Sequence, residues 1–275
     1  QQERWLPDLL SGRALGAFGL TEPDGGSDAG ATRTKARRDG DDWVIDGAKA
    51  FITNSGTPIT SIVTATARDE DGRISAYIIP SGTPGFEVSP PLDKLGWHAS
   101  DTHDLTFDGV RVPVGNLLGE PGNGFRAFLQ ILDDGRIALS ALSLGMARAC
   151  LEIALDYAKQ RNAFGGPIGR FQGLAFQLSD LAVKVENATN LTYKAAWLKD
   201  QGRPFARAAA MAKLYASEAA VDSTRVATQV LGGAGFMEST PLARFYRDAK
   251  ILEIGEGTSE IQRMVIARHL GLPVS

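Results

Sequence analysis

The sequence changes character once, at Gly122-Asn123-Gly124, and this change limits the folds that the chain can adopt. Residues 16–122 contain short β-rich runs separated by turn residues, with no helical segment between them. Such a pattern predicts an antiparallel β-barrel or sandwich and argues against a Rossmann unit, in which helices alternate with strands. Residues 123–275 contain long helical stretches with short connections, which predict an antiparallel helical bundle. We therefore predict an α+β chain with more than one domain.

Two hairpins are predicted in the β-rich half. Residues 42–47 return from a turn at Asp39-Gly40, and the runs 62–66 and 74–79 flank a turn at 69–72. Further short runs are expected at 86–88, 105–107 and 110–113. In the second half we predict helices at about 125–161, about 205–231 and 241–249, one with Leu174, Leu178, Leu181 and Val185 on one face, and a last one after Glu256.

The composition is that of an ordinary globular protein. Of the 275 residues, 43% are hydrophobic, 22% are charged, and the net charge is -3. This slight acidity argues against nucleic acid or a membrane surface as a partner. We see no apolar run that approaches the roughly 20 residues needed to span a membrane. Cys150 is the only cysteine, so no internal disulfide can form and a reducing compartment is expected.

Neither the start of the chain nor its histidines indicate a further function. Residues 1–7 lack an initiator Met and the form of a signal peptide, so we expect the chain to begin inside a longer protein. His98 and His103 lie near Asp101 and Asp104. Without cysteines or a His pair at helical spacing, no metal site is expected there.

The stretch 253–262 places one carboxylate between two glycines. Glu256 stands between Gly255 and Gly257, where the lack of side-chain bulk would let a flat substrate approach closely. Ser259 and Gln262 predict a capping box at the start of the following helix. Spacing alone favours an ordinary helix entry with a solvated acid, so both interpretations stay open at this point.

Three loops, at 20–28, 49–56 and 95–100, are rich in glycine and hydroxyl side chains. Taken singly, each is best explained as a turn, because Gly, Pro, Asp and Ser dominate turns. The alternative is a ligand site, in which the loop hydroxyls bond the polar edge of a planar ligand.

Six stretches, considered together and in their order along the chain, carry a resemblance to one known family. They are Leu20-Thr21-Glu22-Pro23 through Gly26-Ser27-Asp28, Phe51-Ile52-Thr53-Asn54, Leu132-Asp133-Asp134-Gly135-Arg136, 161–172, Gln229-Val230-Leu231-Gly232-Gly233, and Glu256-Gly257-Thr258-Ser259-Glu260-Ile261-Gln262-Arg263. The chain resembles the acyl-CoA dehydrogenase family of flavoproteins over essentially its whole length. That family has an N-terminal helical domain, a middle β-barrel and a C-terminal four-helix bundle. The resemblance implies that residues 1–15 are the tail of a missing N-terminal domain, 16–122 the middle domain and 123–275 the C-terminal domain.

The resemblance also implies FAD as the cofactor, an acyl-CoA as the substrate, and no metal. Cofactor-binding roles are implied for Thr21, Phe51 and Thr53 at the flavin ring, for Thr258 and Glu260 beside the FAD of the same subunit, and for Arg161, Gln172, Gln229, Gly232 and Gly233 toward the FAD of a neighbouring subunit. Substrate-binding roles are implied for Ser27, Asp133, Arg136 and Gly257.

The implied reaction converts an acyl-CoA to a trans-2-enoyl-CoA. Glu256 would remove the α-proton, flavin N5 would take the β-hydride, and an electron-transferring flavoprotein would accept the electrons. Some relatives carry the base at the position of Gly135, which cannot serve, so Glu256 is the implied base. Many relatives have an aromatic residue where this chain has Gly255, so we expect room for a branched or ring-bearing acyl group.

Several alternatives and wider expectations follow from the same resemblance. The other candidates are an acyl-CoA oxidase of this fold and a non-catalytic or DNA-binding relative; the presence of Glu256 and the net acidity count against the latter. We expect a homotetramer or homodimer, located in a bacterial cytoplasm or, in a eukaryote, the mitochondrial matrix. Without the first domain, we expect weak retention of FAD.

Overall fold

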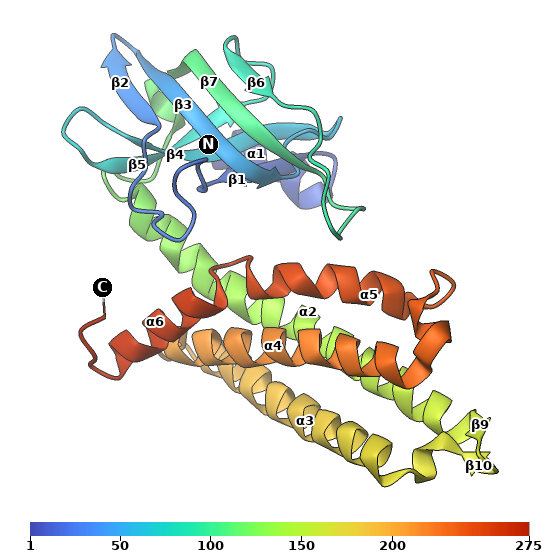
Figure 1. The fold of residues 1–275 in the computed structure, drawn as a ribbon. Coiled ribbons are helices and arrows are strands. Elements are labelled where there is room, and N and C mark those ends of the chain that lie inside the picture. Colours follow the sequence, from blue (N-terminus) through green and yellow to red (C-terminus); the bar gives the residue numbers. More distant parts are fainter. Residues whose placement is uncertain (275) are drawn as a thin grey trace. The chain divides into compact units, whose positions relative to one another are not determined.

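The computed structural model describes residues 1–274, which form two compact units. One unit comprises Gln1–Lys94 and His98–Gln130 and is built on a β-sheet; the other comprises Leu95–Trp97 and the chain from Ile131 onward and is built on helices (Figure 1). The predicted α+β class is therefore confirmed. The helix that starts just after the change in sequence character contributes its first residues to the β unit, so the two units divide at Gln130 and Ile131.

The β unit carries one short helix and one eight-stranded sheet. Its elements are α1 (Gln2–Ser11), β1 (Leu15–Gly19), β2 (Lys35–Asp39), β3 (Asp42–Thr53), β4 (Thr60–Arg68), β5 (Ile74–Pro80), β6 (Phe86–Val88), β7 (Thr102–Pro113), a 3-10 turn η1 (Val114–Asn116) and β8 (Leu117–Leu118). The strand order is β6-β7-β3-β2-β4-β5-β8, with β1 also paired to β4.

Strand pairing confirms both predicted hairpins and corrects the expectation of a purely antiparallel sheet. β2 pairs with β3 and β4 pairs with β5 in antiparallel fashion. However, β4 runs parallel to both β1 and β2. A parallel pair needs a crossover connection, which the alternation of apolar and polar residues along single strands cannot reveal.

Two predicted boundaries in this unit were wrong because of β-bulges. The runs at 105–107 and 110–113 belong to one strand, β7, and the ladder with β3 shifts register between Ile45 and Gly47 to absorb the residues between them. Residues 49–53, expected in a loop, form the end of β3, where a second shift lies between Lys49 and Ile52. A bulge adds one unpaired residue and lets turn-like residues sit inside a strand.

The core of the β unit lies against the sheet and is made of aliphatic and aromatic side chains. Tyr77, Val63, Ile79, Leu105 and Val110 are fully buried there. The two large rings Phe86 and Phe107 stack with centroids 5.3 Å apart. Other members of the core are Ala17, Ala36, Ile45, Ile52, Ala65, Ala67 and Val112.

The helical unit consists of long helices joined by short connections. Its elements are α2 (Gly124–Gln160), which starts in the β unit, a small ribbon of β9 (Asn162–Ala163) and β10 (Gly166–Pro167), η2 (Ile168–Arg170), α3 (Gln172–Asp200), α4 (Ala206–Leu231), η3 (Gly232–Phe236), α5 (Pro241–Ala249), η4 (Lys250–Glu253) and α6 (Ser259–His269). α4 packs against α3, α5 and α6. Its buried face is largely alanine, which lets neighbouring helices approach closely.

Helix α2 corrects one further expectation. Its 37 residues are long and apolar enough to span a membrane by length and composition alone. Serines and charged residues interrupt the apolar pattern of this helix in the sequence. The Ser140 and Ser143 hydroxyls bond backbone carbonyls one turn back. Core helices meet the same criterion, and Leu144, Ala147 and Cys150 of α2 are buried in the core of the helical unit.

Candidate active site

Glu256 lies in the five-residue connection between η4 and α6, in an unusual backbone conformation. Its φ angle is 55°, and Gly257 follows with a φ of 89°. A residue with a Cβ atom rarely adopts this left-handed region, and such residues cluster at functional sites. The conformation is held by side chains from elsewhere: Gln262 Nε2 donates to the carbonyl oxygens of Glu256 (3.1 Å) and Gly257 (2.8 Å). Lys213 Nζ donates to the same Gly257 oxygen at 2.8 Å.

The cap of α6 differs from the predicted capping box. Thr258, not Ser259, is the N-cap, and its hydroxyl accepts a hydrogen bond from Ile261 N at 3.3 Å. The left-handed Gly257 makes Thr258 the last non-helical residue, which shifts the cap by one position. Gln262 reaches back as predicted, but it bonds backbone carbonyls. The buried Ser259 hydroxyl has no partner within residues 1–274.

Gly135 on α2 makes the space that the Glu256 carboxyl occupies. A Cβ atom at Gly135 would lie 2.5 Å from Glu256 Oε2 and 2.8 Å from its Cδ, far closer than two such atoms can approach. The glycine identified as unable to act as a base therefore also has a steric role. The carboxyl group packs directly on the backbone of α2.

Two cations face this carboxyl group. Burial raises the pKa of Glu256, while the charges of Arg136 and Lys213 oppose that rise. Burial and the charge of Arg136 together lower the pKa of Lys213 to about 8, although nearby carboxylates oppose this. Arg136 is itself 6% exposed and donates from Nη1 to Asp133 at 2.5 Å. Burial raises the pKa of Asp133 despite this contact.

Three of the four predicted substrate residues belong to the helical unit: Asp133, Arg136 and Gly257. The Arg136 Nε–H is buried and has no acceptor in the described chain. An unpartnered buried donor from a charged group costs free energy unless a ligand accepts from it. Ser27 belongs to the β unit, where it is exposed in the loop before β2.

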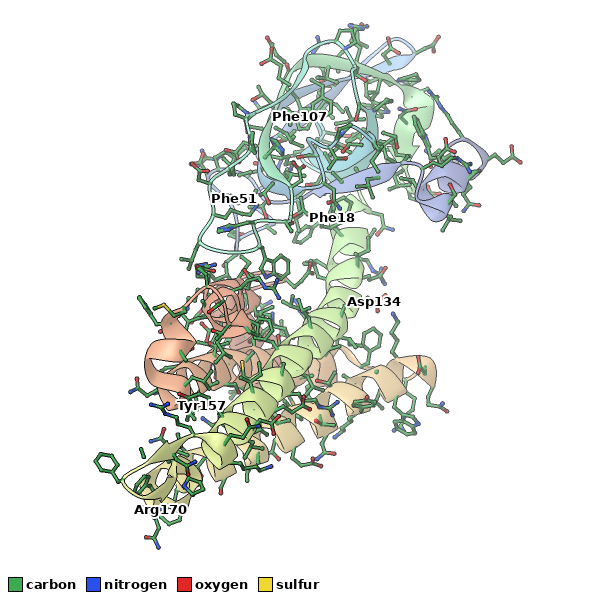
Figure 2. All side chains as sticks on the ribbon, turned by 90° about the vertical axis from the view of Figure 1, so that its right-hand side faces the viewer. Phe18, Phe51, Phe107, Asp134, Tyr157 and Arg170 are labelled. Carbon is green, nitrogen blue, oxygen red and sulfur yellow. The ribbon has the colours of Figure 1, made fainter. Side chains whose placement is uncertain are left out.

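The predicted flavin residues of the β unit lie beside one another. Ala50 N donates to Thr21 O at 2.9 Å, which joins the 20–28 loop to β3. Phe51 has a φ angle of 60° at the bulge, and its N–H donates to Asp104 Oδ1 at 3.0 Å. The strained backbone turns the ring outward, where it is 68% exposed (Figure 2). Thr53 ends β3 and is also exposed.

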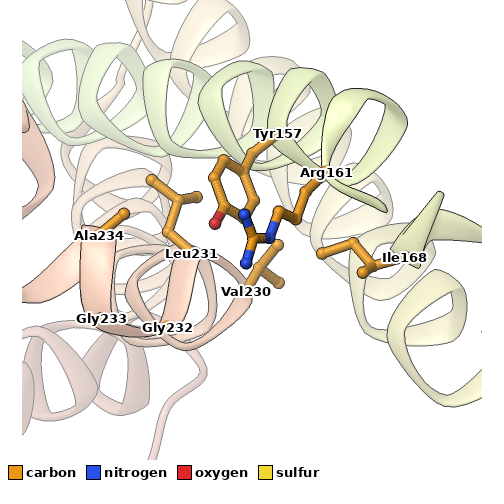
Figure 3. A pocket seen from close by; sticks show the side chains of 8 residues that line it. All are labelled: Tyr157, Arg161, Ile168, Val230, Leu231, Gly232, Gly233 and Ala234. Atoms are coloured by element: carbon orange, nitrogen blue, oxygen red, sulfur yellow. The ribbon is translucent and has the colours of Figure 1, made fainter. Parts of the chain in front are cut away.

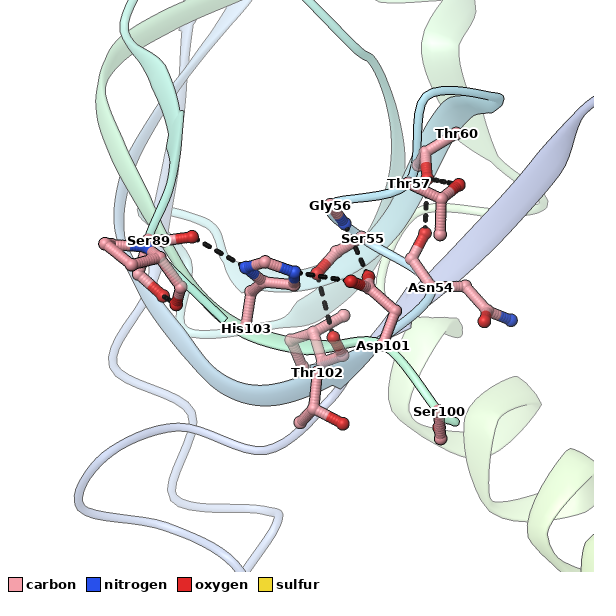
Figure 4. A network of polar contacts seen from close by, with 12 residues as sticks. Asn54, Ser55, Gly56, Thr57, Thr60, Ser89, Ser100, Asp101, Thr102 and His103 are labelled. Carbon is pink, nitrogen blue, oxygen red and sulfur yellow. Dashed lines mark hydrogen bonds and ion pairs between the residues drawn. The ribbon is translucent and has the colours of Figure 1, made fainter. Parts of the chain in front are cut away.

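A histidine network that sequence reasoning missed fixes the chain just after these residues. His103 Nδ1–H donates to Ser89 O and Nε2–H donates to Asp101 Oδ1, both at 2.6 Å (Figure 4). Asp101 Oδ2 accepts from Gly56 N at 2.8 Å. Both ring partners accept hydrogen bonds, and these contacts raise the pKa of His103 despite its burial, which favours the doubly protonated form. Among the described residues no cluster suits a metal.

A second ligand-sized feature is a cavity of about 500 Å³ in the helical unit (Figure 3). It brings Arg161, Gly232 and Gly233 together, as the resemblance implied, with Tyr157 and Leu231 as less polar walls. Gln229 lies in the last turn of α4 and Gln172 at the first residue of α3, and neither lines the cavity. The Arg161 guanidinium makes no ion pair within residues 1–274. An unpaired guanidinium beside side-chain-free glycines suits a phosphate attached to a flat ring system, so these residues fit part of FAD.

Thr258 and Glu260 lie at the start of α6, next to Glu256. The Thr258 hydroxyl and the Glu260 backbone N–H lower the pKa of the exposed Glu260 carboxyl. Neither residue lines the cavity at Arg161, and both lie within four positions of Glu256 in the sequence.

Residues 17–110 match the family description "Acyl-CoA dehydrogenase, middle domain", and residues 122–271 match "Acyl-CoA dehydrogenase, C-terminal domain". The probable acyl-CoA dehydrogenase YngJ of Bacillus subtilis is 51% identical over 98% of this chain and 72% of its own length.

Solved structures give the same result. Butyryl-CoA dehydrogenase from Megasphaera elsdenii superposes with a TM-score of 0.93 at 45% identity, covering 98% of this chain and 71% of its own. A chain from a structure described as the electron transferring flavoprotein of Acidaminococcus fermentans also has a TM-score of 0.93, at 42% identity with the same coverage. The two family matches, the sequence identity and the shared fold together show that this chain belongs to the acyl-CoA dehydrogenase family, an FAD-containing family of oxidoreductases.

Proposed function

We propose that Glu256 is the base that removes the α-proton of an acyl-CoA thioester. The observation that carries this proposal is the seating of Glu256: a left-handed backbone, a carboxyl packed on Gly135, and burial that raises its pKa. An α-proton beside a thioester is weakly acidic, so its base must be held in place and partly desolvated. The charges of Arg136 and Lys213 oppose the rise in pKa and so favour the ionised carboxyl that a base requires.

The peptide group of Glu256 offers a second function. Its N–H makes no hydrogen bond within residues 1–274. We propose that this free donor bonds the thioester oxygen, where negative charge develops as the α-proton leaves. A donor fixed in advance at such a position stabilises the transition state without reorganisation.

Bound FAD supplies the hydride acceptor. The chain would hold it with Thr21, Phe51 and Thr53 at the ring, and with the residues at Arg161 and Gly232 toward the phosphates of a neighbouring subunit's FAD. A ring exposed at 68% on a strained bulge is costly unless a ligand covers it, which supports the role of Phe51. Asp133 and Arg136 would contact the substrate beyond its reacting carbons.

We propose a short acyl chain as the substrate and an electron-transferring flavoprotein as the acceptor. Similarity to a butyryl-CoA dehydrogenase supports the first, and similarity to a chain from the electron transferring flavoprotein structure supports the second. We also propose that the protein forms a homotetramer and works in a reducing compartment. The exposed side chains of Phe176, Tyr193 and Trp197 on α3 are compatible with a subunit interface.

Anaerobic bleaching of the flavin tests the proposal. The full-length protein is mixed with a panel of acyl-CoA thioesters and compared with its Glu256→Gln variant. We expect the butyryl thioester to bleach the parent fastest and the variant at least about 100-fold more slowly, the usual contribution of a general base. Bleaching of the variant at the parent's rate would remove Glu256 from the mechanism. Turnover with air as the sole acceptor would instead indicate an oxidase.

A further inference from the structure

Lys213 is a fully buried cation that the proposed chemistry does not use. It lies in the middle of α4, with 0% of its surface exposed. No carboxylate lies within 4.0 Å of its Nζ atom in the described chain, so it forms no ion pair there. Burying an ammonium group without an ion pair is expensive, because the group loses its hydration. The free-energy cost of burying this ammonium group must be offset by what the group does in the folded protein.

The single hydrogen bond of this ammonium group goes to the loop that carries the base. Nζ donates to Gly257 O at 2.8 Å, and Gln262 Nε2 donates to the same oxygen at 2.8 Å. Lys213 comes from α4 and Gln262 from α6, so the Gly257 carbonyl is held from two helices. The peptide group that links Gly257 to Thr258, directly after the base, cannot rotate without breaking one or both bonds.

The charges around Lys213 come from four other elements. Arg136 faces it from α2, Glu253 from η4, Glu256 from the loop and Glu260 from α6. The three carboxylates attract the ammonium and Arg136 repels it. In return, the ammonium and Arg136 both favour the ionised form of Glu256.

We propose that Lys213 is a positioning residue for Glu256: its bond to Gly257 O keeps the base in its left-handed conformation, and its charge favours the ionised carboxyl. This inference rests on the proposed function of Glu256 as the base. It assigns to a core lysine two effects that can be measured separately, one on geometry and one on the pH at which the base works.

The test compares Lys213→Met with Lys213→Gln in the full-length protein loaded with FAD. Met removes the donor and the charge, whereas Gln keeps an amide donor and removes only the charge. We expect Met to lower kcat by at least about tenfold with little change in KM, as expected for loss of a charged hydrogen bond. Lys213→Gln should lower kcat less than Lys213→Met does. Both variants should move the acid limb of the pH profile of kcat/KM to higher pH, because the pKa of Glu256 rises without the ammonium.

Two controls separate this role from a structural one. Lys184→Met removes a lysine that pairs with Asp222 elsewhere in the same unit, and should leave kcat and the pH profile unchanged. Thermal unfolding of Lys213→Met should not occur at a lower temperature than in the parent, since a desolvated charge is removed. An unshifted acid limb in both variants, or a fall in kcat matched by a fall in unfolding temperature, would overturn the inference. Glu256→Gln, measured in parallel, reports separately on the base: if it keeps full activity, the proposed function fails, whatever Lys213 does.

Discussion

The carboxyl group of Glu256 occupies the space that a side chain at Gly135 would fill, with Oε2 only 2.5 Å from the ideal Cβ position. The residues are 121 positions apart in sequence, yet each constrains the other. An acidic residue on this side of the site requires a glycine on α2. The same contact leaves no room for a second carboxylate at position 135.

Gly135→Ala should lower activity without lowering stability. Alanine is favoured over glycine inside a helix by about 1 kcal/mol, so the fold should hold or gain. The added methyl group must displace the carboxyl, and a misplacement of about 1 Å can cost roughly 100-fold in rate. Gly145→Ala on the same helix is the matched control, because nothing lies within 4 Å of its added Cβ. The test measures the steady-state kcat and the unfolding temperature of both variants. Equal kcat values for Gly135→Ala and Gly145→Ala would mean that the carboxyl does not rest on Gly135.

Gly255→Tyr should narrow the range of acyl groups. Gly255 does not have a positive φ angle, and an added Cβ would meet only Ile251 O, at 3.5 Å, so the backbone tolerates a side chain. A ring there would fill space that we expect a branched acyl group to use. We expect the ratio of kcat/KM for 2-methyl-branched over straight four-carbon thioesters to fall at least about tenfold, since one methylene is worth 10- to 200-fold in a tight pocket. A parent with no activity on branched substrates would contradict the expectation.

The pair of His103 and Asp101 should make stability depend on pH. Hydrogen bonds to Ser89 and Asp101 hold the pKa of His103 above its ordinary value of 6.5, although burial opposes this. The pKa of Asp101 is held below its ordinary value of 3.8 by Gly56 and His103, again against burial. A raised histidine pKa stabilises the fold fully below 6.5, and this is lost as pH rises through the folded value; a lowered aspartate pKa stabilises above 3.8. The pair therefore contributes most between about pH 4 and 6.5.

His103→Gln tests this dependence, with His98→Gln as the control, because His98 is exposed and bonds only Lys94 O. The parent and the control should lose unfolding free energy between pH 6 and pH 8.5, as measured by urea titration. The His103→Gln variant should be less stable than the parent at pH 6 and should lose less unfolding free energy between pH 6 and pH 8.5. An identical pH dependence in all three proteins would show that the pKa of His103 is not raised in the folded state.

The buried ion pair of Glu22 and Lys49 should be essential to the stability of the fold around the loop that carries Thr21. Lys49 Nζ lies 2.7 Å from Glu22 Oε1 with no exposed surface, and Glu22 also accepts from the N–H groups of Arg33 and Thr34. Glu22→Gln leaves a buried ammonium without its counter-charge, which should cost about 3–5 kcal/mol. Adding Lys49→Met should restore much of the loss. Asp24→Asn, which breaks an exposed pair with Arg33, should cost less than about 1 kcal/mol in the same urea titration.

Much of the fold could be predicted from the sequence. Local signals were enough for the hairpins around Gly40 and Gly72 and for the helices, whereas the role proposed for Glu256 came from the family resemblance, because spacing alone left it open. The parallel pairing of β4 and the bulge at Phe51 were missed, because both depend on which strand lies beside which. His103, Lys213 and the steric role of Gly135 were missed for the same reason: each acts through a partner many residues away, and a single buried charge leaves no periodic trace in the sequence.

The role of Glu256 can be measured most directly by exchange of the α-proton of a bound acyl thioester with deuterium from the solvent. This reports proton removal itself and does not require electrons to leave the protein. The full-length protein is compared with Glu256→Gln and with Glu186→Gln, which alters an exposed carboxylate on α3. We expect the parent and Glu186→Gln to exchange the α-proton at the same rate, and Glu256→Gln to exchange it at least about 100-fold more slowly. Exchange by Glu256→Gln at the parent's rate would contradict the assignment of Glu256 as the base.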